Sequence, residues 1–67
     1  MGSPRLTILH IRALSIIRAL NGEVRQTGLQ WILSDLLRKT DHEVTVILSD
    51  LEATGDIVVD RGWIKAA

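Results

Sequence analysis

Two histidines and several serines are the side chains whose types could support metal binding or nucleophilic catalysis. His10 and His42 stand far apart, and neither has a cysteine or second histidine at metal-ligand spacing. Ser15, Ser34 and Ser49 have no neighbouring base and orienting acid in a recognisable arrangement. The glycines do not form a phosphate-binding loop. The sequence therefore predicts no enzyme, no metal site and no cofactor.

Basic and acidic residues are balanced. Lys plus Arg number 8 and Asp plus Glu number 8, so the formal net charge is zero. A strongly basic chain would favour nucleic acid, because neutralising phosphates releases counterions. The zero balance lowers that expectation without removing it, since a local basic patch matters more than the sum.

The length of 67 residues predicts one small domain covering residues 1–67, with residues 1–3 as a cloning remnant that carries no function. There is no cysteine, and the 46% of hydrophobic residues suffice for a core. Self-association is the expected further source of stability. No apolar stretch approaches the roughly 20 residues of a membrane-spanning helix. Because no secretory signal is recognisable either, we expect a cytoplasmic protein.

The first element that must position functional residues is a helix from Ser3-Pro4 to about Leu20, ended by Asn21-Gly22. Helical spacing gives it an inward stripe of Leu6, Leu9, Ala13, Ile16, Ile17 and Leu20. A second stripe points largely the other way and comprises Ile8, Ile11 and Leu14.

A short extended segment at 23–26 precedes a second helix, for which Thr27 is the expected cap. This helix has an inward stripe of Leu29, Ile32, Leu33 and Leu36. Trp31 falls on the opposite, polar side, so it is either an exposed anchor for a partner or a residue lying flat on a neighbouring helix.

The third helix has the clearest signals. Thr40 and Glu43 have capping-box spacing, and Gly55 stands where a helix-ending left-handed residue is expected. The inward stripe is Val44, Ile47, Leu48 and Leu51. A β-hairpin follows, with strands at 57–59 and 63–64 around a turn at 60–62, and Trp63 is expected to pack against the core.

From Arg5 to Lys65 the chain resembles the winged helix-turn-helix superfamily of bacterial and phage transcription regulators, and among them compact members such as small winged-helix proteins of Mu-like prophages. The resemblance is carried by Leu29-x-x-Ile32-Leu33, the turn with Thr40, Val44-x-x-Ile47-Leu48-x-x-Leu51, Gly55-Asp56-Ile57 and Gly62-Trp63-Ile64. It implies a mainly α fold of three helices with a two- or three-stranded wing.

The resemblance also implies binding to double-stranded DNA, with the third helix in the major groove and the wing on the adjacent minor groove or backbone. The implied base-reading positions are His42, Glu43, Thr45, Val46, Ser49 and Asp50. The implied phosphate or minor-groove contacts are Arg25, Arg38, Lys39, Thr40, Arg61 and Lys65. One departure stands out, because Glu43, Asp50 and Glu52 make the third helix acidic where most DNA readers carry arginine or lysine.

Ile8, Ile11 and Leu14 need a covering surface, for which a homodimer contact between first helices competes with cover by the hairpin or tail. The leading interpretation is thus a homodimeric DNA-binding regulator. The rival is a winged-helix module that binds protein and has lost DNA binding, favoured by the acidic helix and Trp31. A truncated fragment whose missing part carried the function is a third interpretation.

Overall fold

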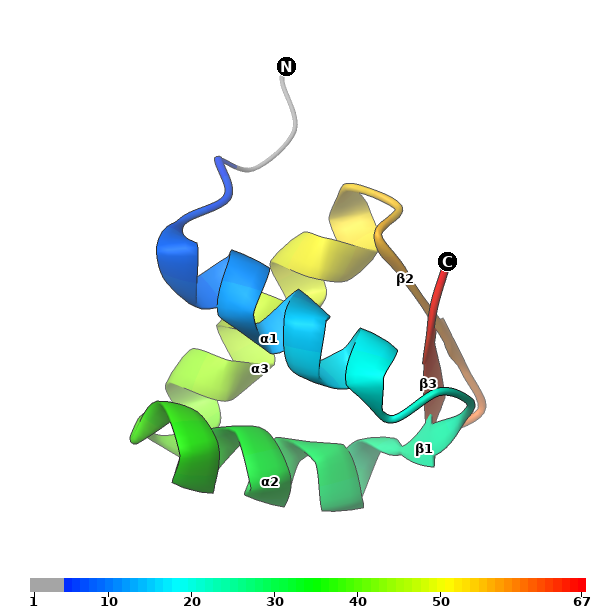
Figure 1. Cartoon of the computed structure of the whole chain (residues 1–67), viewed down its shortest axis with the longest axis horizontal. Coiled ribbons are helices and arrows are strands. Elements are labelled where there is room, and N and C mark those ends of the chain that lie inside the picture. The colour runs from blue at the N-terminus through cyan, green and yellow to red at the C-terminus, as the bar shows by residue number, and fades with distance from the viewer. Residues whose placement is uncertain (1–4) are drawn as a thin grey trace.

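Three helices and a three-stranded antiparallel sheet form the fold of the computed structural model, which describes residues 5–67. The elements follow in the order α1 (Ile8–Ala19), β1 (Val24–Arg25), α2 (Gln26–Leu37), α3 (Asp41–Ala53), β2 (Ile57–Asp60) and β3 (Trp63–Ala66). The sheet lies beside the helices, with β3 between β1 and β2 (Figure 1). This layout agrees with the predicted mainly helical class and is compatible with a winged helix. Across residues 5–67, no helix has the length and apolar character needed to cross a membrane.

The start of α1 differs from the prediction. The expected cap at Ser3-Pro4 lies outside the described residues, and residues 5–7 are not helical. Thr7 is the N-cap, and its backbone N–H donates to Nδ1 of His10 at 3.0 Å. This side chain returns to the capping residue and closes the first turn, so the helix begins at Ile8.

The start of α2 also differs, because β1 passes into the helix without a linker. Gln26 is the first helical residue, and Arg25 rather than Thr27 occupies the cap position. The Gln26 N–H donates to the carbonyl of Gly62 in the hairpin at 2.8 Å. A tertiary hydrogen bond thus satisfies one of the free amides at the helix start. The capping role expected for Thr27 is not observed.

The sequence signals for α3 are confirmed. The Thr40 hydroxyl accepts a hydrogen bond from the backbone N–H of Glu43 at 3.2 Å, as a capping residue does. Gly55 follows the helix with φ +82°, a conformation that residues with a Cβ rarely adopt. The predicted inward stripe is buried throughout and consists of Val44, Ile47, Leu48 and Leu51.

The hairpin turns through two residues of positive φ. Asp60 pairs with Trp63, which leaves Arg61 at φ 53° and Gly62 at φ 82° in the turn. Positive φ at both positions defines a type I′ turn, whose twist matches that of the flanking strands. The predicted extended segment before α2 is confirmed as β1, which pairs with β3 right beside the turn. All three strands therefore reach the residues next to the turn, and the hairpin does not project beyond the sheet as a long wing.

Twelve buried apolar side chains fill the space between the helices and the inner face of the sheet: Ala13, Leu14, Ile17, Leu29, Leu33, Leu37, Val44, Ile47, Leu48, Leu51, Ile57 and Ile64. The predictions for Leu14, Leu20, Leu36 and Trp63 are wrong. Leu20, assigned to the inward stripe of the first helix, is the C-cap of α1 and is exposed. Leu14 belongs to this core and not to an outer stripe, while Leu36 is 55% exposed and Leu37 is buried in its place. Trp63 lies on the outer face of the sheet, because strand alternation gives the inner position to Ile64.

Candidate nucleic-acid interface

The side of α3 that faces away from the core carries His42, Val46 and Ser49, all exposed. These three residues, called here the outward face of α3, lie opposite the buried stripe at 100° of rotation per residue. They belong to the base-reading positions that the superfamily resemblance implies. The side chains of His42 and Ser49 make no hydrogen bond within residues 5–67, so their polar atoms are available to a ligand.

Two other implied contact residues are engaged within the fold. The Thr45 hydroxyl donates to the Asp41 carbonyl at 2.8 Å and accepts from Nε2 of Gln30 at 2.8 Å. The Thr40 hydroxyl accepts from the Glu43 N–H as the helix cap. Both hydroxyls are therefore engaged in positioning α3 and its start, whereas His42 and Ser49 have no side-chain hydrogen bond within residues 5–67.

The acidic side chains of α3 lie toward its two edges. Glu43 accepts a hydrogen bond from the Thr40 hydroxyl at 3.3 Å, and its carboxylate lies 3.8 Å from Nζ of Lys39. Asp50 turns toward α1, where Oδ2 lies 2.8 Å from Nε2 of His10. Neither carboxylate is part of the outward face, so the acidity of α3 that the sequence displays is partly withdrawn from a ligand placed there.

The contact between His10 and Asp50 is a joint between α1 and α3 that sequence reasoning missed. Nδ1 of His10 accepts the Thr7 N–H, so the ring proton resides on Nε2 and is donated to the Asp50 carboxylate. His10 is buried, which makes a hydrogen-bonded arrangement of its ring necessary. The residue type of His10 by itself suggests only metal binding. Its position three residues after a threonine was the available signal for a capping role.

The candidate phosphate-binding residues form two groups at opposite ends of α2. Arg38 and Lys39, the turn group, lie between α2 and α3. The wing group, Arg25, Arg61 and Lys65, belongs to the sheet beside the start of α2. The 12 residues of α2 span about 18 Å at 1.5 Å per residue. That separation exceeds the roughly 12 Å width of a B-DNA major groove, so the two groups can reach the backbones on either side of it.

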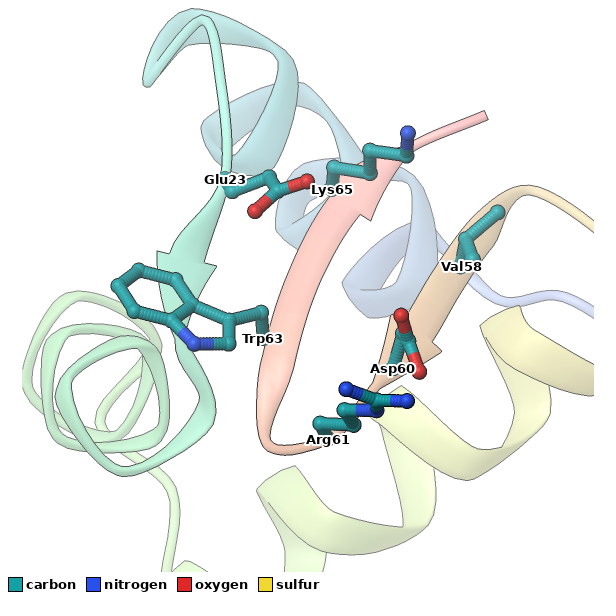
Figure 2. Close-up of a pocket in the computed structure, with 6 residues that line it drawn as sticks. All are labelled: Glu23, Val58, Asp60, Arg61, Trp63 and Lys65. Carbon is teal, nitrogen blue, oxygen red and sulfur yellow. The ribbon is translucent and has the colours of Figure 1, made fainter.

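An aromatic ring contacts one member of the wing group, Arg25. Cζ of Arg25 lies 4.8 Å from the centroid of the Trp63 ring, a cation–π contact on the outer face of the sheet. Figure 2 shows the Trp63 ring extending toward β1, with Lys65 further along the same strand and Asp60 beside Arg61 near the turn. These residues line a shallow hollow together with Glu23 and Val58. The stacking holds the guanidinium of Arg25 in place without neutralising it.

The residues predicted for protein contacts separate in the structure. Trp31 is 73% exposed on α2, on the polar side as predicted. Ile8 and Ile11 are 73% and 60% exposed on α1, whereas Leu14, assigned to the same dimer contact, is buried. The predicted α1 interface is thus reduced to two isoleucines.

Residues 5–67 contain no cluster of three or more His, Asp or Glu side chains that could hold a metal ion. Comparison with known proteins found no matching family, no matching curated protein and no matching solved structure.

Proposed function

We propose that this protein is a winged-helix DNA-binding regulator, with α3 in the major groove and the hairpin on the neighbouring backbone. The proposal is carried by two features together: cations lie at both ends of α2, and none of the three residues of the outward face of α3 is acidic. Helix-turn-helix proteins place the second helix of the pair in the major groove and use flanking groups on phosphates. The order of helices and strands here supports the same use of α2 and α3.

Each residue of the outward face of α3 has a distinct role in the proposal. Ser49 donates or accepts a hydrogen bond at a base edge, and Val46 contacts a thymine methyl group. His42, close to the helix N-terminus, reaches a base edge or a phosphate. The turn group and the wing group supply at most five phosphate contacts for each subunit, which predicts weak and strongly salt-dependent binding by a monomer.

Replacing Arg61 or Lys39 by alanine is expected to weaken binding to every duplex sequence. Each lost phosphate contact should also lower the slope of log affinity against log salt by about 0.9. Fluorescence anisotropy with a labelled random duplex between about 50 and 200 mM salt measures both quantities. Arg5→Ala is the matched control, because Arg5 is exposed, lies ahead of α1 and belongs to neither the turn group nor the wing group, so its loss should leave the affinity and slope unchanged. Equal effects at all three positions would mean that the cations act only through total charge.

Replacing Ser49 by alanine is expected to change sequence preference and leave the salt slope unchanged. A lost base contact typically costs about 1–3 kcal/mol at one base pair and nothing at the others. Selection from a randomised duplex library, done in parallel for the parent and the variant, reads out this difference. Identical selected sequences would remove Ser49 from the readout.

A protein-binding function is the second candidate, and the exposure of Trp31 is the observation that favours it. Tryptophan is enriched among residues that dominate binding energies at protein interfaces. The ring stands beside a shallow hollow lined by Thr27, Gln30 and Asp41. A gel shift with random duplex at low salt separates the two functions, since a protein-binding module gives no shift even at high micromolar concentration.

A further inference from the structure

Charge is segregated between α1 and α3. α1 contains Arg12 and Arg18 and no acidic residue, and neither arginine belongs to an ion pair within residues 5–67. α3 contains Asp41, Glu43, Asp50 and Glu52 and neither lysine nor arginine. Although the net charge of the chain is zero, α1 is therefore positively charged and α3 negatively charged.

The outward face of α1 is an apolar strip between two cations. Ile8, Ile11 and Ser15 occupy the solvent side of the helix, and both isoleucines are exposed. At 100° per residue, Arg12 and Arg18 stand about 120° apart with these three residues between them. A shallow hollow next to the strip, between α1 and α2, adds the exposed side chain of Leu36 to the same surface.

The outward face of α3 has the same layout with the opposite charge. Val46, the exposed apolar residue, lies with His42 and Ser49 between the edges of the helix. Glu43 marks one edge, where its carboxylate lies 3.8 Å from Nζ of Lys39, and Glu52 marks the other edge, about 180° away around the helix axis, with no ion-pair partner within residues 5–67. Both glutamates are exposed.

The complementary layouts make a second copy of the chain the natural occupant of the outward face of α1. We propose that copies associate head to tail, with the outward face of α1 in one copy against the outward face of α3 in the next. Ile8 and Ile11 then cover Val46, while Arg12 and Arg18 approach the glutamates. A symmetric contact between two α1 helices is disfavoured instead, because it gathers the arginines of both copies with no carboxylate between them.

Head-to-tail association does not stop at two copies. α1 and α3 pack against each other through their buried stripes, and α1 crosses α3 in Figure 1, so the two outward faces point away from each other. A contact between two different surfaces that does not close on itself produces chains of increasing length. The association also covers the surface assigned to DNA. This competition rests on the proposed function, whereas the association itself does not.

Sedimentation velocity of the full chain over a range of concentrations tests the association. At about 50 mM salt the average mass should grow beyond that of a dimer as concentration rises. At about 1 M salt, where the screening length falls to about 3 Å, it should return toward the monomer. A monomer under all conditions, or a mass that stops at the dimer, overturns the proposal.

A charge exchange tests the pairing of the two faces. Arg12→Glu and Glu52→Lys should each reduce the association constant at least about tenfold, in the range of coupling between close charge pairs at interfaces. An equimolar mixture of the two variants should recover association, because each then offers the charge that the other lacks. Arg61→Glu is the control and should associate like the parent, since Arg61 lies in the hairpin turn.

Circular dichroism establishes that each variant is folded before its mass is compared. Failure of the mixture to associate overturns the proposed pairing. Duplex binding measured at protein concentrations where the parent is monomeric is independent of this result. A failed association with intact DNA binding therefore removes only the head-to-tail contact, and the opposite outcome removes only the DNA function.

Discussion

Replacing Leu51 by alanine is expected to lower the free energy of unfolding by about 2–5 kcal/mol. Leu51 is fully buried in α3 and belongs to the core shared by the helices and the sheet. A chain of 67 residues has a stability of about 3–10 kcal/mol at the usual 0.05–0.15 kcal/mol per residue. The substitution therefore removes a large share of the stability and can leave the chain unfolded at 37 °C.

Urea denaturation followed by circular dichroism measures this change, and Leu36→Ala is its matched control. Leu36 is the leucine of α2 that helical spacing assigned to the core and that is largely exposed in the structure. Its truncation should cost less than about 1 kcal/mol, because surface substitutions usually stay near 0.5 kcal/mol. Equal losses at the two positions would contradict the arrangement of the core.

Replacing His10 by phenylalanine is expected to destabilise the fold by about 1–3 kcal/mol, although it keeps an aromatic ring of similar size. The change removes the acceptor of the Thr7 N–H and the donor to the Asp50 carboxylate. Asp50 is only partly exposed, so water replaces the lost donor incompletely. The same denaturation experiment measures the loss.

His42→Phe is the control for this prediction, since His42 is exposed and has no side-chain partner within the described residues. It should leave the stability within about 0.5 kcal/mol of the parent. Asp50→Asn, which retains an acceptor oxygen, should fall between the parent and His10→Phe. A neutral or stabilising His10→Phe would show that the joint between α1 and α3 contributes nothing net.

The sequence predicts best where the signals are local. Thr40 and Glu43 define the start of α3. Gly55 marks the end of this helix, and Gly62 marks the hairpin turn. Each of these features depends on backbone geometry that neighbouring residues determine. The order of helices and strands could be predicted from them without knowledge of the tertiary contacts.

The wrong predictions at Leu36 and Trp63 arise where adjacent apolar residues compete for one buried position. Two pairs of neighbouring hydrophobic residues show this: Leu36 with Leu37, and Trp63 with Ile64. Periodicity alone does not decide which member of each pair is buried. Packing against the other elements makes that choice. A register error of one residue reverses the face of a strand, which is what happened at Trp63.

The candidate site could be predicted only as a set of residue types. Composition reveals the acidic residues of α3 but not that Glu43 turns back to the cap or that Asp50 turns toward α1. The partner of Asp50 is 40 positions away, and no local pattern links the two. The stacking of Arg25 on Trp63 likewise depends on strand pairing that brings distant segments together.

Titration of a labelled random-sequence duplex with the unmodified protein at about 50 mM salt is the decisive measurement of DNA binding by this chain. We expect a rise in anisotropy at micromolar protein that weakens as salt increases. The slope of log affinity against log salt should be no steeper than about 4.5 for five phosphate contacts. An anisotropy that stays flat at about 50 mM salt, up to the highest protein concentration at which the chain is monomeric, would contradict DNA binding, because this electrostatic attraction is at its strongest at low salt.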